Sequence, residues 1–138
     1  MANRFQNPEI AERLLKEART IAVVGLSDNP ARPSYDVASF LQDKGYKIIP
    51  VNPNIETVLG EKSYPDLRSI PGQIDVVDIF RRSEDVGLIV EEAITRGTRA
   101  VWMQLGVIDE AAAERAAGAG LEVIMDLCMK REYRRIHD

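Results

Sequence analysis

The segment GLSDNPARPS, from Gly25 to Ser34, is the part of the sequence best suited to bind an anion. It follows the continuous apolar run TIAVV, which predicts a strand buried on both faces. It precedes residues with helical spacing, and Ser34 is the expected cap of that helix. At such a strand-to-helix turn, free backbone N–H groups and the helix dipole together favour a phosphate. The first turn therefore predicts a nucleotide-binding edge.

The same turn departs from the dinucleotide fingerprint G-x-G-x-x-G. Its three glycine positions are occupied by Gly25, Ser27 and Pro30, so only the first glycine is kept. The second and third glycines normally allow close approach of the pyrophosphate and close packing of helix and strand. NAD enzymes also carry an acid after the second strand, whereas this chain has Asn52 there and no carboxylate until Glu56. A ligand other than NAD is favoured.

Other catalytic chemistries find little support in the sequence. The P-loop pattern is absent, and the single histidine, His137, lies next to the last residue, where a solvated side chain is expected. The single cysteine, Cys128, has no histidine near it in sequence and is interpreted as a small buried thiol, with a redox or thiol-exchange role left open. We predict neither catalytic residues nor a metal site.

Extended and helical patterns alternate along the whole chain. Strands are expected at 20–24, 46–51, 74–80, 100–105 and 121–125. Helices are expected before the first strand and in three of the connections, with caps at Asn7, Ser34, Ser83 and Asp109, whereas residues 52–73 are expected to be mostly loop. This alternation predicts an α/β fold, a Rossmann-like, doubly wound parallel five-stranded sheet with helices on both faces. The predicted strand order is 3-2-1-4-5, with a ligand at the carboxyl ends of the first and fourth strands.

Length and charge narrow the class of protein. With 138 residues, the chain is predicted to form a single domain over residues 1–138. The net charge of −4 argues against a nucleic-acid partner, and no apolar run is long enough to span a membrane. One cysteine and the absence of a signal peptide favour the cytoplasm.

Five blocks of sequence, in this order and spacing, carry a family resemblance. They are VVGLSDNPARPS at 23–34, GYKIIPVNP at 45–53, IDVVDIFRRSEDV at 74–86, VWMQLGV at 101–107 and AGLEVIMDLC at 119–128. The chain thereby resembles the small stand-alone CoA-binding proteins. These are similar to the CoA-binding domain of the succinyl-CoA synthetase alpha subunit and of ADP-forming acyl-CoA synthetases. The resemblance departs near Cys128, which is flanked here by Leu127 and Met129 rather than by a basic residue and a proline.

The resemblance implies a CoA site at the carboxyl edge of the sheet. Phosphates would meet Gly25, Leu26, Ser27 and Arg32; adenosine would lie beside Asn52 and Pro53; and Phe80, Arg81 and Arg82 would line the crevice beyond the third strand. The three arginines agree with this, because a guanidinium suits the phosphate groups of CoA. The relatives' catalysis uses a phosphorylated histidine and a nucleotide-grasping domain, which 138 residues do not accommodate.

Three functions remain in view at this point. The first is binding of coenzyme A, or of a short acyl-CoA, without catalysis. The second is an NAD(P)-binding Rossmann oxidoreductase, and the third is a protein-interaction module with an empty nucleotide cleft. A protein partner or a homodimer is compatible with all three, and the physiological acyl form is left open.

Overall fold

The computed structural model describes residues 4–137. The helices are α1 (Pro8–Glu17), α2 (Pro33–Asp43), α3 (Val86–Arg96), α4 (Glu110–Gly118) and α5 (Met129–His137), and a 3₁₀ turn, η1 (Ser83–Asp85), precedes α3. The strands of the main sheet are β1 (Thr20–Val24), β2 (Lys47–Val51), β5 (Val76–Ile79), β6 (Ala100–Met103) and β7 (Glu122–Met125). Two short strands, β3 (Thr57–Val58) and β4 (Glu61–Lys62), form a separate antiparallel pair.

The main sheet is parallel and five-stranded, as predicted, but its strand order is not the predicted one. The observed order is β2-β1-β5-β6-β7, which corresponds to 2-1-3-4-5 for the five expected strands. The prediction 3-2-1-4-5 is therefore wrong: β5 pairs with β1, and β2 forms the edge of the sheet. The fold is still a doubly wound α/β arrangement, because 2-1-3-4-5 is the other strand order that is common in such sheets.

Pro50 gives the physical reason for this order. On one side, β2 pairs with β1 in the register Val23 to Pro50. On its other side, the Pro50 carbonyl accepts from Tyr64 N at 3.0 Å, and a single bridge joins Val51 to Tyr64. A proline has no N–H to donate to a further strand, so it is tolerated at an edge and not in the middle of a sheet. The connection after β2 covers this edge and then returns to β5 beside β1.

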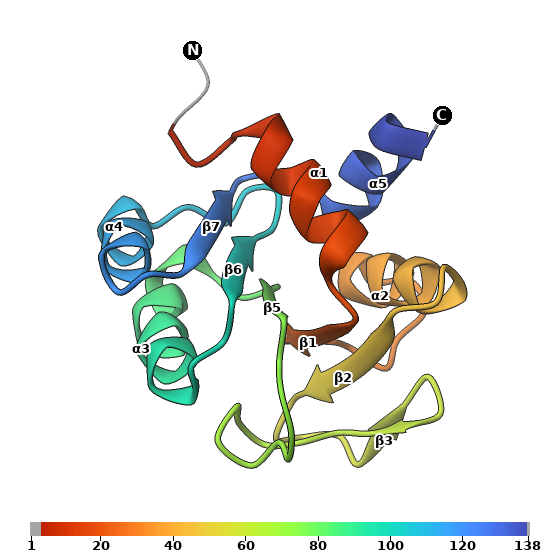
Figure 1. The fold of residues 1–138 in the computed structure, drawn as a ribbon. Coiled ribbons are helices and arrows are strands. Elements are labelled where there is room, and N and C mark those ends of the chain that lie inside the picture. Colours follow the sequence, from red (N-terminus) through yellow and green to blue (C-terminus); the bar gives the residue numbers. More distant parts are fainter. Residues whose placement is uncertain (1–3, 138) are drawn as a thin grey trace.

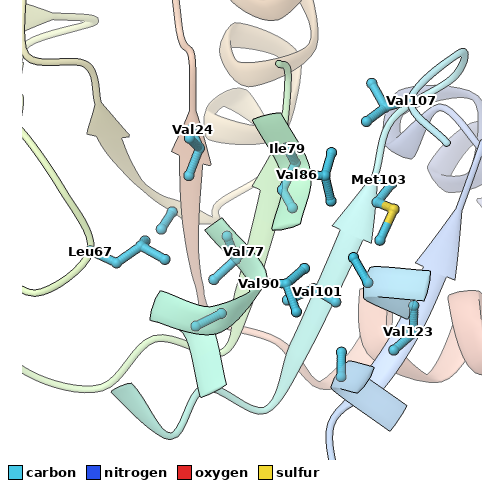
Figure 2. Packing of buried hydrophobic residues seen from close by; sticks show 14 of the residues in the cluster. Val24, Leu67, Val77, Ile79, Val86, Val90, Val101, Met103, Val107 and Val123 are labelled. Atoms are coloured by element: carbon cyan, nitrogen blue, oxygen red, sulfur yellow. The ribbon is translucent and has the colours of Figure 1, made fainter. Parts of the chain in front are cut away.

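Helices cover both faces of the sheet, as predicted (Figure 1). Helices α3 and α4 lie on one face, and α1, α2 and α5 lie on the other. Figure 2 shows the core under α3, where Val86 lies near Ile79 and Met103, and Val90 lies near Val77 and Val101. Leu67, from the irregular connection between β4 and β5, packs into the same core and covers the part of this face that α3 does not reach.

Two of the four expected helix caps are confirmed, and two are corrected. The side chains of Asn7 and Asp109 cap α1 and α4, and Gly97 ends α3 in the left-handed conformation. Ser34, in contrast, lies inside the first turn of α2 and does not cap it, because Pro33 occupies the first helical position. Likewise, Ser83 begins η1, and the α-helix itself follows Asp85.

The last helix, α5, was not expected from the sequence. It packs beside α1, where Arg135 Nη2 donates to the Pro8 carbonyl at 3.3 Å. Across residues 4–137, none of the helices has the length and apolar character needed to cross a membrane.

Candidate functional site

The carboxyl ends of the strands border a cleft of about 1090 Å³. Its walls come from the loops after β1, β5 and β6, from the first turn of α2 and from α5. The lining residues are Gly25, Ser27, Arg32, Pro33, Ser34, Asp36, Val37, Phe80, Arg81, Arg82, Asp85, Gln104, Leu105, Val107, Cys128, Lys130, Arg131 and Arg134. This is the edge at which doubly wound sheets bind ligands.

The corrected strand order also moves the centre of the predicted crevice. The expectation was the ends of the first and fourth strands, whereas in the structure β1 is adjacent to β5 at the point where the strand order reverses. The chain after β5 consequently meets the first turn directly. A Cβ atom at Gly25 would lie well inside 3.0 Å of the Phe80 carbonyl oxygen, and the Gly25 φ is +88°. Only glycine accommodates both the close approach of the Phe80 carbonyl and this positive φ.

The first turn is held in shape by its own side chains. Ser34 Oγ accepts from Ser27 N at 3.0 Å, and Ser27 Oγ accepts from Asn29 N at 3.0 Å. Helix α2 begins at the wall of the cleft with Arg32 at its cap position, and no side chain caps it. The free N–H groups of its first turn therefore remain available to an anion.

The cleft is strongly positive, although the chain as a whole is acidic. Within residues 4–137, its walls carry six cationic side chains, Arg32, Arg81, Arg82, Lys130, Arg131 and Arg134, and two carboxylates, Asp36 and Asp85. Such a local excess of guanidinium and ammonium groups favours a ligand with several phosphate charges.

Half of these cations are already paired. Arg81 and Arg82 both contact Asp85, at 3.3 and 3.4 Å, and Lys130 contacts Asp36 at 2.9 Å. The exposed side chains of Arg32, Arg131 and Arg134 form no ion pair with any residue in the described part of the chain. These three arginines are thus the ones most available to a ligand.

The structure brings six of the nine predicted site residues together. Gly25, Ser27, Arg32, Phe80, Arg81 and Arg82 line the same cleft.

Leu26, Asn52 and Pro53 lie outside the lining of this cleft. The Leu26 side chain is fully buried in the core, and its carbonyl accepts from Asn52 Nδ2 at 3.1 Å. Asn52 Oδ1 accepts from Asn54 N at 2.9 Å, so this side chain holds together the loops after β1 and β2. Pro53 is exposed beside it.

Sequence reasoning missed the contribution of α5, which supplies Lys130, Arg131 and Arg134. Apolar side chains at Met129, Tyr133 and Ile136 have helical spacing and would have indicated this helix. Tyr133 packs edge-on against Phe40 of α2, with ring centres 5.5 Å apart, and so holds the basic side of α5 against the cleft. Half-buried Cys128 lines the cleft directly before the helix.

A buried carboxyl group lies under the cleft, in β5. Asp78 is fully buried, and its Oδ1 accepts from Gln104 Nε2 at 2.8 Å. Its Oδ2 has no hydrogen-bond partner among the described residues. Burial raises the pKa of Asp78 to about 7, an effect that the Gln104 hydrogen bond opposes. Gln104 itself lines the cleft.

The remaining candidates for chemistry lie elsewhere. His137 is exposed and its ring stacks on Tyr133 at a centre-to-centre distance of 4.1 Å, away from the cleft lining. Across residues 4–137, histidine, cysteine, aspartate and glutamate side chains do not gather in groups of three or more that could hold a metal ion.

The fold and this cleft agree with the result of comparison with known families. Residues 19–134 match the family model described as the CoA binding domain. The chain belongs to this CoA-binding domain family, as its sequence blocks indicated.

Three relatives show the range of this family. The chain is 46% identical to an uncharacterized protein, YneT, of Bacillus subtilis, over 91% of this chain and 95% of that one. A hypothetical protein from Pyrococcus horikoshii superimposes with a TM-score of 0.92 at 35% identity, with full coverage of both chains. The chain is also 30% identical to an ADP-forming acetate–CoA ligase of Archaeoglobus fulgidus over 67% of its own length, but spans only 14% of the length of that ligase.

Proposed function

We propose that this protein binds coenzyme A, or a short acyl-CoA, in the cleft at the carboxyl edge of the sheet. The observation that carries the proposal is the coincidence of a CoA-binding domain family match with a cleft that gathers six cations in an acidic protein. CoA carries a diphosphate and a 3′-phosphate, and charge-assisted hydrogen bonds to such groups are among the stronger polar contacts.

The phosphate groups would lie between the first turn and α5. Gly25 and Ser27 leave backbone at the cleft wall, and α2 presents its uncapped N-terminus there. Arg32 stands at that terminus, and Arg134 faces the same cleft from α5. The helix dipole and these guanidinium groups act in the same direction, since both stabilise negative charge.

The alternative of a dinucleotide enzyme is disfavoured by the geometry after β2. The side chain there is Asn52, and both its amide nitrogen and its oxygen are used within the loops. An acid that could bind a ribose diol is missing at this position, and Ser27 and Pro30 replace the second and third fingerprint glycines. A ligand with a phosphorylated ribose fits these features better.

We further propose that the protein binds this ligand without transforming it. The chain spans only 14% of the length of the ADP-forming ligase that it resembles, and its only histidine, His137, lies outside the cleft. Purified protein mixed with acetate, CoA and ATP or GTP is expected to form no thioester. Nucleotide-dependent acyl-CoA synthesis that a Gly25→Ala variant lacks would refute this part.

Isothermal calorimetry with CoA, acetyl-CoA, NAD⁺, NADP⁺ and ATP tests the binding proposal directly. The expected result is that CoA or acetyl-CoA binds most tightly and that NAD⁺ binds weakly or not at all. Tighter binding of NAD⁺ or NADP⁺ would favour the oxidoreductase. A lack of binding by all five would favour the interaction module.

A further inference from the structure

The buried Asp78 stands where a carboxyl group is costly to keep. It lies in the middle of the sheet, between Val23 of β1 and Trp102 of β6 in the strand register. Both neighbours belong to the apolar core on the α2 and α5 side. Its Oδ2 is unpartnered among residues 4–137, and a buried polar atom without a partner lowers stability. A role for the other oxygen, Oδ1, would explain why a carboxyl group occupies this position.

That other oxygen contacts the floor of the cleft. Gln104 Nε2 donates to Asp78 Oδ1 at 2.8 Å, and Gln104 is only 3% exposed although it lines the cleft. Above its pKa of about 7, Asp78 is an ionised carboxylate, which accepts hydrogen bonds and cannot donate them. It therefore fixes which end of the Gln104 amide points down. The amide oxygen, Oε1, is the end left for a ligand.

The floor around Gln104 differs from the rest of the cleft. The lining residues that follow β6 are Gln104, Leu105 and Val107, and none of these is charged. The cations come from the turns after β1 and β5 and from α5. A neutral acceptor among aliphatic side chains suits a secondary amide N–H rather than a phosphate. In a ligand of the CoA class, such amides occur in the pantetheine arm.

We propose that Asp78 is a positioning residue that holds Gln104 so that its amide oxygen accepts a hydrogen bond from an amide N–H of the pantetheine arm. This inference rests on the proposed function, and it assigns the neutral floor to the pantetheine half of the ligand and the cationic walls to the nucleotide half. Gln104 would contact the ligand, and Asp78 would act only through Gln104.

Calorimetry at pH 8 with whole CoA and with its two halves tests this assignment. Gln104→Met keeps the length of the side chain and removes the acceptor. We expect it to weaken CoA and 4′-phosphopantetheine by about fivefold, the value of one neutral hydrogen bond, and to leave adenosine 3′,5′-bisphosphate unchanged. Gln104→Ala serves as a second variant if the methionine packs poorly.

A double-mutant cycle then tests the role of Asp78. The substitution Asp78→Asn replaces the carboxylate with an amide that offers both a donor and an acceptor, so the Gln104 amide is free to turn over. The expected loss of CoA affinity is about threefold in the native background, with no further loss in the Gln104→Met background, because Asp78 acts through Gln104.

Two results would overturn the inference while leaving CoA binding intact. One is an equal effect of Asp78→Asn in both backgrounds, and the other is an equal effect of Gln104→Met on both halves of CoA. If the native protein binds no CoA at all, the proposed function fails first and this inference fails with it.

Discussion

The two edges of the parallel sheet differ in how fully their polar groups are paired within the protein. At the amino edge, charges are paired within the fold: Arg99 contacts Glu17 at 2.6 Å and Glu122 at 3.1 Å. Asp75 Oδ2 accepts from the backbone nitrogens of Arg19 and Thr20, at 2.7 and 3.0 Å. These contacts tie the strands together where they begin.

At the carboxyl edge, several polar groups lack an ionic or hydrogen-bond partner in the described chain, although Arg81, Arg82 and Lys130 are paired. Arg32 and Arg134 have no carboxylate partner, and α2 has no side-chain cap. The amino edge therefore serves folding, whereas the carboxyl edge holds groups that a ligand would satisfy. Matched changes at the two edges test this difference.

The largest difference is expected between two glycines with positive φ. Gly25→Ala at the carboxyl edge meets the Phe80 carbonyl, whereas Gly45→Ala, at φ +101°, meets nothing within 4 Å. Both variants should lose about 1–3 kcal/mol from backbone strain, and Gly25→Ala should lose more. Only Gly25→Ala should also weaken CoA, by more than about a hundredfold, because the first turn must move. Equal affinities of the two folded variants would refute a CoA site at this turn.

A second pair of variants compares two aspartates of the β5 segment, Asp78 inside the strand and Asp75 just before it. Asp78 has its pKa raised to about 7 by burial, so the native state gains stability as pH falls. This gain is complete below about pH 4 and is lost as pH rises through 7, a change on the order of 4 kcal/mol. Asp78→Asn should remove this pH dependence and be the more stable protein at pH 8. Denaturant unfolding at pH 5 and pH 8 measures both effects.

The matched change at the amino edge should act in the opposite direction. Asp75→Asn weakens the acceptor for Arg19 N and Thr20 N and should lower stability by about 1 kcal/mol. If Asp78→Asn and Asp75→Asn lower the free energy of unfolding equally at pH 8, the buried Asp78 carboxylate does not destabilise the native state as its burial and unpartnered oxygen indicate.

Two arginines provide a smaller contrast in affinity. Arg32→Ala removes an unpaired guanidinium at the start of α2 and should weaken CoA about tenfold, with little change in thermal stability. Arg13, which pairs with Glu122 near the amino edge, is the control, and Arg13→Ala should leave CoA affinity unchanged. If Arg32→Ala and Arg13→Ala bind CoA with the same affinity, the phosphates do not lie beside α2.

The smallest effect is expected at Arg82. Its side chain is 75% exposed and already contacts Asp85, so part of its charge is compensated before any ligand arrives. Arg82→Ala should weaken CoA by only about threefold, and less at high salt because exposed charges are screened. A loss larger than that of Arg32→Ala would reverse the proposed ranking of paired and unpaired arginines.

Much of the fold could be predicted because its signals are local. The run TIAVV ends just before Gly25, and β1 ends at Val24. Asn7 and Asp109 cap helices in the structure, as their sequence positions indicated. Pairing between strands is not local, and the order was predicted wrongly. Pro50 could nevertheless have indicated the position of β2, because a strand that contains a proline lacks one backbone N–H for pairing and therefore belongs at the edge of a sheet.

For the site too, residues with local signals could be predicted, and residues placed by contacts between distant segments could not. The family resemblance selected Arg81 and Arg82, and their position just after a buried strand supports that choice. The α5 arginines could not be placed in the cleft, because their side of the helix is set by the packing of Tyr133 on Phe40 across a large distance in sequence. The partners of Asp78 and Gln104 depend on the pairing of β5 with β6, which only the assembled sheet defines.

The most direct test of the CoA site is a map of backbone amide chemical shifts during titration of the labelled protein with CoA. We expect the large changes at Gly25 and Ser27, at Arg81, and along the first turns of α2 and α5, which border the cleft. Gly45 and Gly97, which lie at the other edge, should not move. Changes concentrated at those glycines, or the absence of any change with CoA in excess, would contradict the assignment of the carboxyl edge to CoA.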